Sequence, residues 1–156
     1  KDTKAKGKPA SKKETESDTP RNVAALIEAK KYHEAQSVLE DTRVDNPCDP
    51  FILASLGWVN WLLLGENPSR SSEDPVEFID LALTFDSKNM LALEYKAKIL
   101  LSKGANTQAK AVLKRLLTVE PRAQWAKTAL QNLSDGGSGN SAADRKRRFW
   151  RNEGDR

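Results

Sequence analysis

The chain has 156 residues and a formal net charge of +4, from 26 basic and 22 acidic side chains. Its one cysteine excludes an internal disulfide framework and a cysteine metal cluster, so a reducing compartment, the cytoplasm, is expected. No apolar run reaches the roughly 18 residues of a membrane span. Residues 21–133 hold 14 basic and 14 acidic side chains, and this neutrality argues against a nucleic-acid-binding face.

Composition divides the chain into a central domain and two tails. The lysine-rich N-terminal segment has alanine as its main apolar residue, so it cannot bury enough surface to offset the entropy of folding. The C-terminal segment begins with a glycine and serine spacer and ends in a basic cluster. We therefore expect a disordered basic linker at 1–19, a folded domain at 20–133 and a flexible basic tail at 134–156.

Prolines mark the expected helix starts, because a proline in the first turn loses no helical hydrogen bond. Polar residues precede these prolines in the pairs Thr19-Pro20, Asp49-Pro50, Asp74-Pro75 and Glu120-Pro121. No segment alternates between apolar and polar residues as a half-buried strand would, so an all-α fold is expected. The expected helices span residues 21–30, 33–44, 50–64, 75–86, 89–103, 107–118 and 122–133.

A pattern of small and apolar residues recurs along these helices with a period of 34 residues. Val23 and Pro47 are 24 positions apart, and so are Ala97 and Pro121. The middle copy is longer by six residues, inserted at 67–72. A fixed period of this length predicts stacked helical hairpins, which present surfaces to partners rather than catalytic clefts.

Several motifs of this pattern resemble the tetratricopeptide repeat family. They are Leu56-Gly57, the run from Lys31 to Ala35, the run from Gly104 to Ala109, Pro47 and Pro121. Val23, Pro75 and Asn60 depart from the family pattern. The resemblance implies a superhelix of three helical hairpins, with the first helix of each pair lining the inner surface. Its repeats cover about 16–49, 50–89 and 90–123, and a capping helix covers 122–133.

The expected helix at 50–64 is apolar around nearly its whole circumference, as in a helix that is enclosed or that awaits a partner. The inward positions of the repeats, which we expect to bind a partner segment, are Ile27, Phe51, Ala54, Trp58, Trp61, Leu91, Glu94, Tyr95, Lys98 and Leu101. Aromatic anchors with charge at the rim suit such a site, and they require Trp58 and Trp61 to be partly exposed. Alternatively, the two indole rings fill a tight superhelix interior and bind nothing.

Catalytic and metal-binding constellations are not found in the sequence. His33, the only histidine, stands beside Glu34 at a helix start, where a surface position is expected. Cys48 lies in a turn between two prolines and has no basic neighbour to activate its thiol. We expect no enzyme activity, no cofactor and no metal.

The tail ends in one compact basic and aromatic motif. Its residues are Arg145, Lys146, Arg147, Arg148, Phe149 and Trp150. They are expected to contact an acidic partner or an anionic membrane surface, with nucleic acid ranked last. The alternative is a solubilising end. With the lysine-rich linker and the Gly57-Trp58 pair, this tail also resembles the C-terminal regions of multidomain bacterial regulatory proteins.

These features together predict a noncatalytic protein–protein interaction module, an adaptor or scaffold that binds a partner segment in its inner groove. The inward positions are mostly apolar, with Lys98 as the one base, so a clamp for a C-terminal carboxylate is not expected. Two alternatives stay open. A secretion-type chaperone would shield an apolar client in the same groove, and a membrane or nucleic-acid binder would act through the tail.

Overall fold

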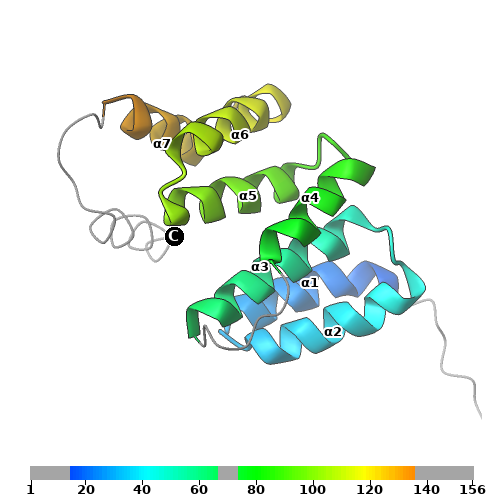
Figure 1. Ribbon diagram of the computed structural model, residues 1–156. Coiled ribbons are helices and arrows are strands. Elements are labelled where there is room, and N and C mark those ends of the chain that lie inside the picture. Colours follow the sequence, from blue (N-terminus) through cyan, green and yellow to red (C-terminus); the bar gives the residue numbers. More distant parts are fainter. Residues whose placement is uncertain (1–14, 67–73, 136–156) are drawn as a thin grey trace, which may run out of the picture.

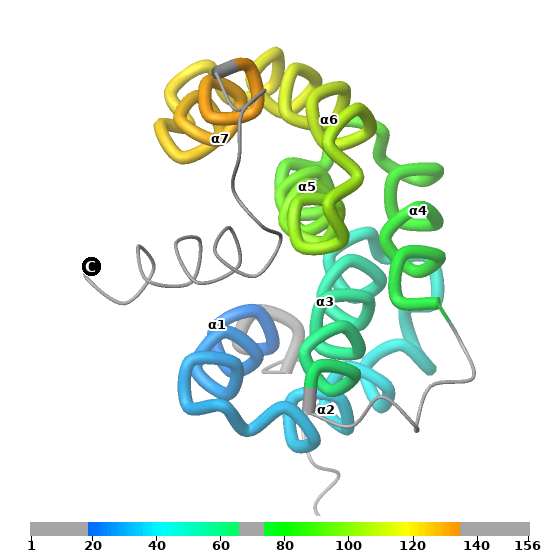
Figure 2. Tube along the Cα trace, turned by 60° about the vertical axis from the view of Figure 1, so that its left-hand side comes forward, coloured from blue at the N-terminus to red at the C-terminus, as the bar shows by residue number. Residues whose placement is uncertain are grey.

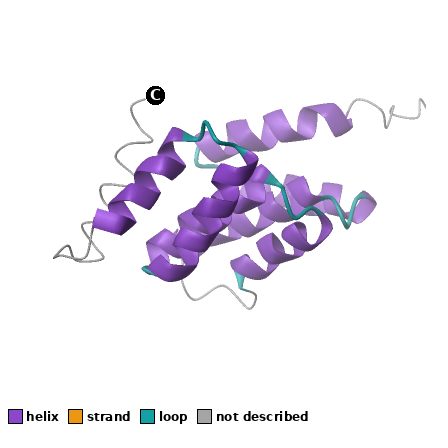
Figure 3. Cartoon of the chain, turned by 90° about the horizontal axis from the view of Figure 1, so that it is seen from above, coloured by secondary structure: helices purple, strands orange, loops and turns teal. Residues whose placement is uncertain are grey.

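The computed structural model describes residues 15–66 and 74–135, and within these ranges it contains seven helices and no strand (Figures 1 and 3). The all-α expectation is therefore confirmed. The helices are α1 (Thr15–Glu28), α2 (Tyr32–Asp45), α3 (Pro50–Glu66), α4 (Pro75–Phe85), α5 (Met90–Lys103), α6 (Asn106–Val119) and α7 (Gln124–Asp135).

The helices form antiparallel hairpins that stack into a curved array. Each helix contacts the next one along the chain, and α3 also contacts α5. In Figure 2, α1, α3, α5 and α7 lie along the concave side of the array, while α2, α4 and α6 lie along its outer side. The expected superhelix of three hairpins and a closing helix is therefore confirmed, with the first helix of each pair on the inner side.

Most helix ends follow local sequence signals. The Asp49 carboxylate accepts a hydrogen bond from the backbone N–H of Phe51 at 2.8 Å at the start of α3. Asp74 caps α4 in the same way, and the Asn89 side chain caps α5. Such caps satisfy backbone donors that have no partner within the helix. The chain leaves α5 through Gly104, whose φ of 73° is in the left-handed region that glycine adopts without strain.

The first helix begins earlier than expected. We predicted its start at residue 21, but α1 begins at Thr15 and Pro20 lies inside it. A proline at this position removes one hydrogen bond, to the carbonyl of residue 16, and its fixed φ is compatible with a helix. The buried Val23 holds the following turn against α2 and α3. Pro20 therefore does not mark the helix start.

Small residues lie where the helices approach most closely. A Cβ atom at Gly57 would lie 2.5 Å from the Ile79 Cγ1 atom and 2.6 Å from the Pro75 carbonyl oxygen. Ala35, Ala97 and Ala109, which are small residues of the repeat motifs, are fully buried. These positions set the short distances between paired helices.

Two departures from the family pattern have local explanations. Asn60 accepts a hydrogen bond through its Oδ1 atom from Gln36 Nε2 at 2.8 Å, so this polar residue links α3 to α2. Pro75 occupies the first turn of α4, where it loses no helical bond, and its carbonyl oxygen faces Gly57.

The capping helix α7 closes the array through an apolar face. Ala126 is fully buried against Leu93 and Leu113, which belong to α5 and α6. Trp125, Leu130 and other half-buried residues of α7 pack around the same cluster. The polar residues Lys127, Gln131 and Asn132 are exposed, as expected for a terminal helix that faces water.

Candidate functional site: the concave face

The structure places the ten predicted site residues at two depths. Ala54, Trp58 and Lys98 are buried, with 0%, 5% and 8% of their surface exposed. The other seven are half-buried: Ile27, Phe51, Trp61, Leu91, Glu94, Tyr95 and Leu101. The expectation that Trp58 is partly exposed is therefore wrong, whereas Trp61 does retain some exposure.

Trp58 is buried because an aromatic ring of another helix covers it. The Tyr95 ring of α5 stacks on the Trp58 ring of α3, with centroids 4.9 Å apart and ring planes 2° from parallel. Both residues belong to the apolar cluster around Leu53, Ile79 and Ile99. Trp58 thus forms the floor of the concave face, and Tyr95 is the layer above it.

Lys98 joins three inner helices. Its ammonium group lies 5.7 Å from the Trp58 ring centroid and 5.6 Å from that of Trp125 in α7. It also forms an ion pair with Glu94 at 2.9 Å, one turn earlier in α5. Attraction between a cation and the face of an indole ring is strengthened when water is excluded. Lys98 therefore connects α3, α5 and α7 at the centre of the concave face.

Trp125 is a member of this site that sequence reasoning missed. It packs against the apolar cluster that contains Leu93, Leu113 and Ala126. Its ring also meets Lys98, which is 27 positions earlier in the chain. The sequence did offer a signal for this residue, namely a large aromatic side chain in α7. This helix takes the inner position that the first helix of a fourth hairpin would take.

Trp61 lies further along α3 and has its own cationic neighbour. The Lys103 ammonium lies 5.5 Å from the Trp61 ring centroid, and it is 3.8 Å from the carboxylate of Asp74. Ile27 of α1 packs against the cluster that includes Trp58. The half-buried aromatic residues of this face are thus Trp61, Tyr95 and Trp125, flanked by charged groups.

Phe51 does not join this aromatic group. It packs with Val23 and Leu39 in a separate cluster between the first hairpin and the start of α3. There it borders a hollow of about 340 Å³ that is also lined by Thr19, Pro20, Thr42, Asn46, Asp49 and Ile52. Two helical turns separate Phe51 from Trp58, which places it towards one edge of the array.

Charge is distributed unevenly along the array. The described residues up to 89, which form α1 to α4, include five basic and 13 acidic side chains, a net charge of −8. Residues 90–135, which form α5 to α7, include eight basic and three acidic side chains, a net charge of +5. The described residues therefore have a net charge of −3, and this small total conceals an acidic part and a basic part.

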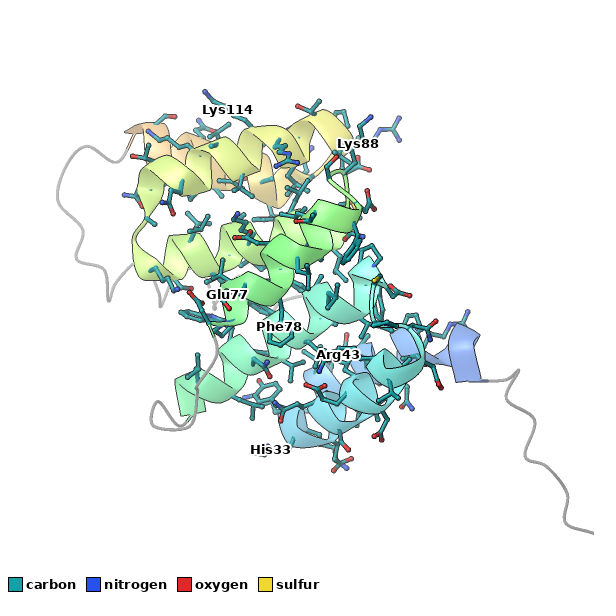
Figure 4. The ribbon with its side chains drawn as sticks, turned by 45° about the vertical axis from the view of Figure 1, so that its right-hand side comes forward. His33, Arg43, Glu77, Phe78, Lys88 and Lys114 are labelled. Carbon is teal, nitrogen blue, oxygen red and sulfur yellow. The ribbon has the colours of Figure 1, made fainter. Side chains whose placement is uncertain are left out.

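The outer surface holds the residues that sequence reasoning left without a role. His33 is exposed at the start of α2, and Cys48 is exposed in the turn before α3. Figure 4 shows the Arg43 side chain near Phe78 of α4, where its guanidinium carbon lies 5.8 Å from the ring centroid. This contact links the outer helices α2 and α4 and leaves the concave face unaffected.

Three further observations concern metal sites, membrane spans and the predicted contact residues of the tail. Within residues 15–66 and 74–135, no three histidine, cysteine or acidic side chains are grouped so that they could hold a metal ion. None of the described helices is long and apolar enough to cross a membrane. The tail residues Arg145 to Trp150 lie outside the described part of the chain.

Comparisons with known proteins identify the fold. No family model matches the sequence, and no curated protein matches it either. Among solved structures, the chain is similar to the Arabidopsis OM64 TPR domain, with a TM-score of 0.62 and 16% identity over 75% of this chain and 92% of that one.

A second similar structure is the second TPR domain of the human RPAP3 protein, solved by NMR in complex with the HSP70 peptide SGPTIEEVD. Its TM-score is 0.60, with 14% identity over 77% of this chain and 95% of that one. The chain therefore has a tetratricopeptide-type fold, as the sequence resemblance implied.

Proposed function

We propose that this chain is a noncatalytic protein–protein interaction module, an adaptor or scaffold that binds a segment of another protein on its concave face. The observation that carries the proposal is the incomplete burial of the aromatic residues Trp61, Tyr95 and Trp125 along this face. Large aromatic side chains that stay partly exposed on a rigid support are typical anchors of binding surfaces. The structural similarity to a TPR domain in complex with a peptide supports a protein partner.

The burial values revise which predicted residues contact the partner. Trp58, Ala54 and Lys98 form the supporting floor, because little of their surface is exposed. Contacts are assigned instead to Trp61 and Tyr95, with Trp125 added. The half-buried Leu91, Leu101 and Ile27 extend the apolar surface, and Glu94 adds charge beside it.

The proposed ligand is an apolar segment, bound as a helix or in an extended form. The one buried base of this face, Lys98, is already ion-paired with Glu94 at 2.9 Å. A ligand carboxylate would have to compete with Glu94 for this ammonium group. Apolar contacts with the half-buried rings are therefore the main source of affinity.

We place the module in the cytoplasm because its single cysteine is unpaired.

A pair of matched variants tests the proposal. Trp61→Ala removes a proposed anchor from the concave face, and Phe85→Ala removes a residue that is 50% exposed at the end of the outer helix α4. Proteins retained by the immobilised chain are identified by mass spectrometry, and the affinity of each is then measured. Loss of one anchor of about 2 kcal/mol corresponds to roughly a thirtyfold weaker complex for Trp61→Ala. Equal affinity for the two variants would contradict a concave binding site.

Trp58→Ala provides the stability control. Because this ring is enclosed, its truncation is expected to lower the free energy of unfolding by about 3 to 5 kcal/mol. Trp61→Ala is expected to lower it by less, because part of the Trp61 ring is already in water. Urea unfolding of both variants separates a folding defect from a loss of affinity. If Trp61→Ala unfolds as readily as Trp58→Ala, Trp61 is a core residue and not an anchor.

A further inference from the structure

The last turn of each outer helix has an exposed apolar side chain. Val44 lies in the last turn of α2, Phe85 ends α4 and Val119 ends α6, and their exposed fractions are 82%, 50% and 36%. Met90, which begins α5 on the other side of the turn from Phe85, is 47% exposed. The three outer helices run in the same direction, so their last turns lie along one edge of the array, on the right in Figure 1. We call this surface the turn edge.

A hydrogen bond shows that two of these helix ends adjoin. The Arg115 side chain of α6 donates from Nη2 to the Ser87 carbonyl oxygen, in the turn between α4 and α5, at 2.9 Å. Ser87 is two residues after Phe85, and Val119 is about one helical turn after Arg115. Figure 4 shows Lys88 of the same turn beside the end of α6. The exposed apolar side chains therefore belong to one surface, and such groups of apolar side chains mark interaction sites.

The α2 end of the turn edge is acidic. Asp41, Asp45 and Asp49 are exposed there. Arg43, which lies between them in the sequence, is already paired with Glu40 at 3.0 Å. Asp49 also lines the hollow of about 340 Å³ described above, and none of the described residues that line this hollow is basic. This end therefore presents carboxylates to a basic surface.

The α6 end of the same edge is basic. Lys114, Arg115 and Arg122 are exposed in α6 and in the turn that follows it. Glu120, which is half-buried in this turn, accepts a hydrogen bond from the Arg122 backbone N–H at 2.9 Å. The two ends of the turn edge thus have opposite charges, and the surface is complementary to another copy of itself.

One arrangement of two copies matches these charges. Because the hairpins stack in series, the end of α4 lies between the ends of α2 and α6. A twofold axis through the end of α4 therefore brings the acidic end of each copy against the basic end of the other. Around this axis lie Phe85 and Met90, with one charge of each sign, Asp86 and Lys88. An apolar centre with a charged rim is the usual anatomy of a protein interface.

We propose that the turn edge binds a second copy of this chain in a symmetric, antiparallel dimer, in which the α2 end of each copy contacts the α6 end of the other. Every contact then occurs twice, because the interface is formed by the same surface of both copies. The surface is of small extent, so we expect a weak dimer that is populated at about 0.1 mM chain. The turn edge consists of helix ends, whereas the concave face consists of helix sides, so the dimer presents two open concave faces.

Sedimentation equilibrium of the full chain tests the stoichiometry. At concentrations up to about 0.5 mM, we expect the mass to rise from that of one chain to that of two and no further. In about 1 M salt, where charges are screened within about 3 Å, the dimer should dissociate more readily. A mass of one chain at every concentration overturns the proposal. Masses that continue to rise beyond two chains show open head-to-tail assembly, and this result also overturns it.

Reversal of one charge at each end tests which ends meet. A rim ion pair changes affinity by about twofold to fivefold and occurs twice, so Asp45→Arg and Arg122→Glu should each raise the dissociation constant about fourfold to 25-fold. The double variant Asp45→Arg/Arg122→Glu again has opposite charges at the two ends and should dimerise more tightly than either single variant. Glu34→Arg makes the same change of charge at the exposed start of α2, on the opposite edge, and should have no effect. A double variant that is weaker than both single variants overturns the proposal.

Cross-linking tests the position of the twofold axis. Single cysteines are introduced into the full chain with Cys48→Ser, and copper phenanthroline serves as the oxidant. Met90→Cys should form a disulfide between two copies, because a residue beside the axis lies close to its equivalent. Val44→Cys should not, since the two equivalent residues lie at opposite ends of the interface. The opposite result, or no cross-link for either variant, overturns the antiparallel arrangement.

Variants of the two surfaces separate this inference from the proposed function. Phe85→Ser should weaken the dimer, and urea unfolding checks that this variant remains folded. Trp61→Ala should leave the dimer unchanged, because Trp61 lies on the concave face. If Trp61→Ala loses the partner while the chain is monomeric at every concentration, only the dimer proposal fails. If the dimer forms but Trp61→Ala and Phe85→Ala retain the partner equally, the concave binding site fails instead.

Discussion

Gly57 and Gly65 lie in the same helix, α3, and the same substitution at both positions measures how tightly α3 packs against α4. A Cβ atom at residue 57 would lie 2.5 Å from Ile79 Cγ1 and 2.6 Å from the Pro75 carbonyl oxygen. Ordinary contacts of this kind are about 3.5 to 4 Å, so the two helices must separate by about 1 Å. The carbonyl oxygen belongs to the backbone and cannot rotate away. At Gly65, an added Cβ meets no atom within 4 Å.

Both Gly→Ala variants gain up to about 1 kcal/mol of helix stability, because alanine loses less backbone entropy than glycine. Only Gly57→Ala also suffers the overpacking, which costs about 1 to 3 kcal/mol. The difference between the two variants therefore isolates the steric effect. At a urea dependence of about 2 kcal/mol per molar, we expect the midpoint of Gly57→Ala about 0.5 to 1.5 M below that of Gly65→Ala. Equal midpoints would refute the close approach of α3 and α4.

Three further predictions concern stability, each measured by urea unfolding. Cys48→Ser should change the free energy of unfolding by less than about 0.5 kcal/mol because Cys48 is exposed in a turn, and a larger loss would show that the turn is packed. Lys98→Ala should cost about 2 to 3 kcal/mol by leaving the half-buried Glu94 unpaired. Lys98→Met should lower the free energy of unfolding by less than Lys98→Ala does. Equal losses for the two variants would exclude a packing role for the Lys98 side chain. Asn60→Ala and Gln36→Ala should each cost about 1 kcal/mol and the double variant no more than about 1.5, while full additivity would exclude the bond between them.

Local features of the sequence were sufficient to predict most of the helix limits. Asp49, Asp74 and Asn89 cap helices through hydrogen bonds to backbone groups two or three residues away, so their effect does not depend on the rest of the fold. The 34-residue period and the small residues at helix contacts likewise predicted the stacked hairpins. Two of the four prolines are exceptions. Burial of the following turn decided that α1 continues through Pro20. Pro121 lies in the turn before α7, which begins at Gln124 and not at residue 122.

The exposure of each predicted site residue could not be derived from the sequence. Helical spacing places Trp58 and Trp61 near the same side of α3, yet one is enclosed and the other is half-buried. The difference comes from Tyr95 and Lys98 of α5, because the Tyr95 ring stacks on the Trp58 ring and the Lys98 ammonium lies 5.7 Å from its centroid. The repeat pattern identifies only which side of a helix faces inward. How deeply a residue on that side is buried depends on residues that are distant in the chain.

The charge of the folded region shows the same division between sequence and structure. Residues 21–133 have a net charge of zero, but their basic and acidic side chains are unequally distributed along the chain. The consequence of that distribution depends on the architecture, because a compact fold with many distant contacts would mix early and late segments. In a stacked array each hairpin contacts mainly its neighbours, so order along the chain becomes position in space. The sequence by itself thus determined the helices and their charges, whereas the stacking decided that α1 to α4 form an acidic part and α5 to α7 a basic part.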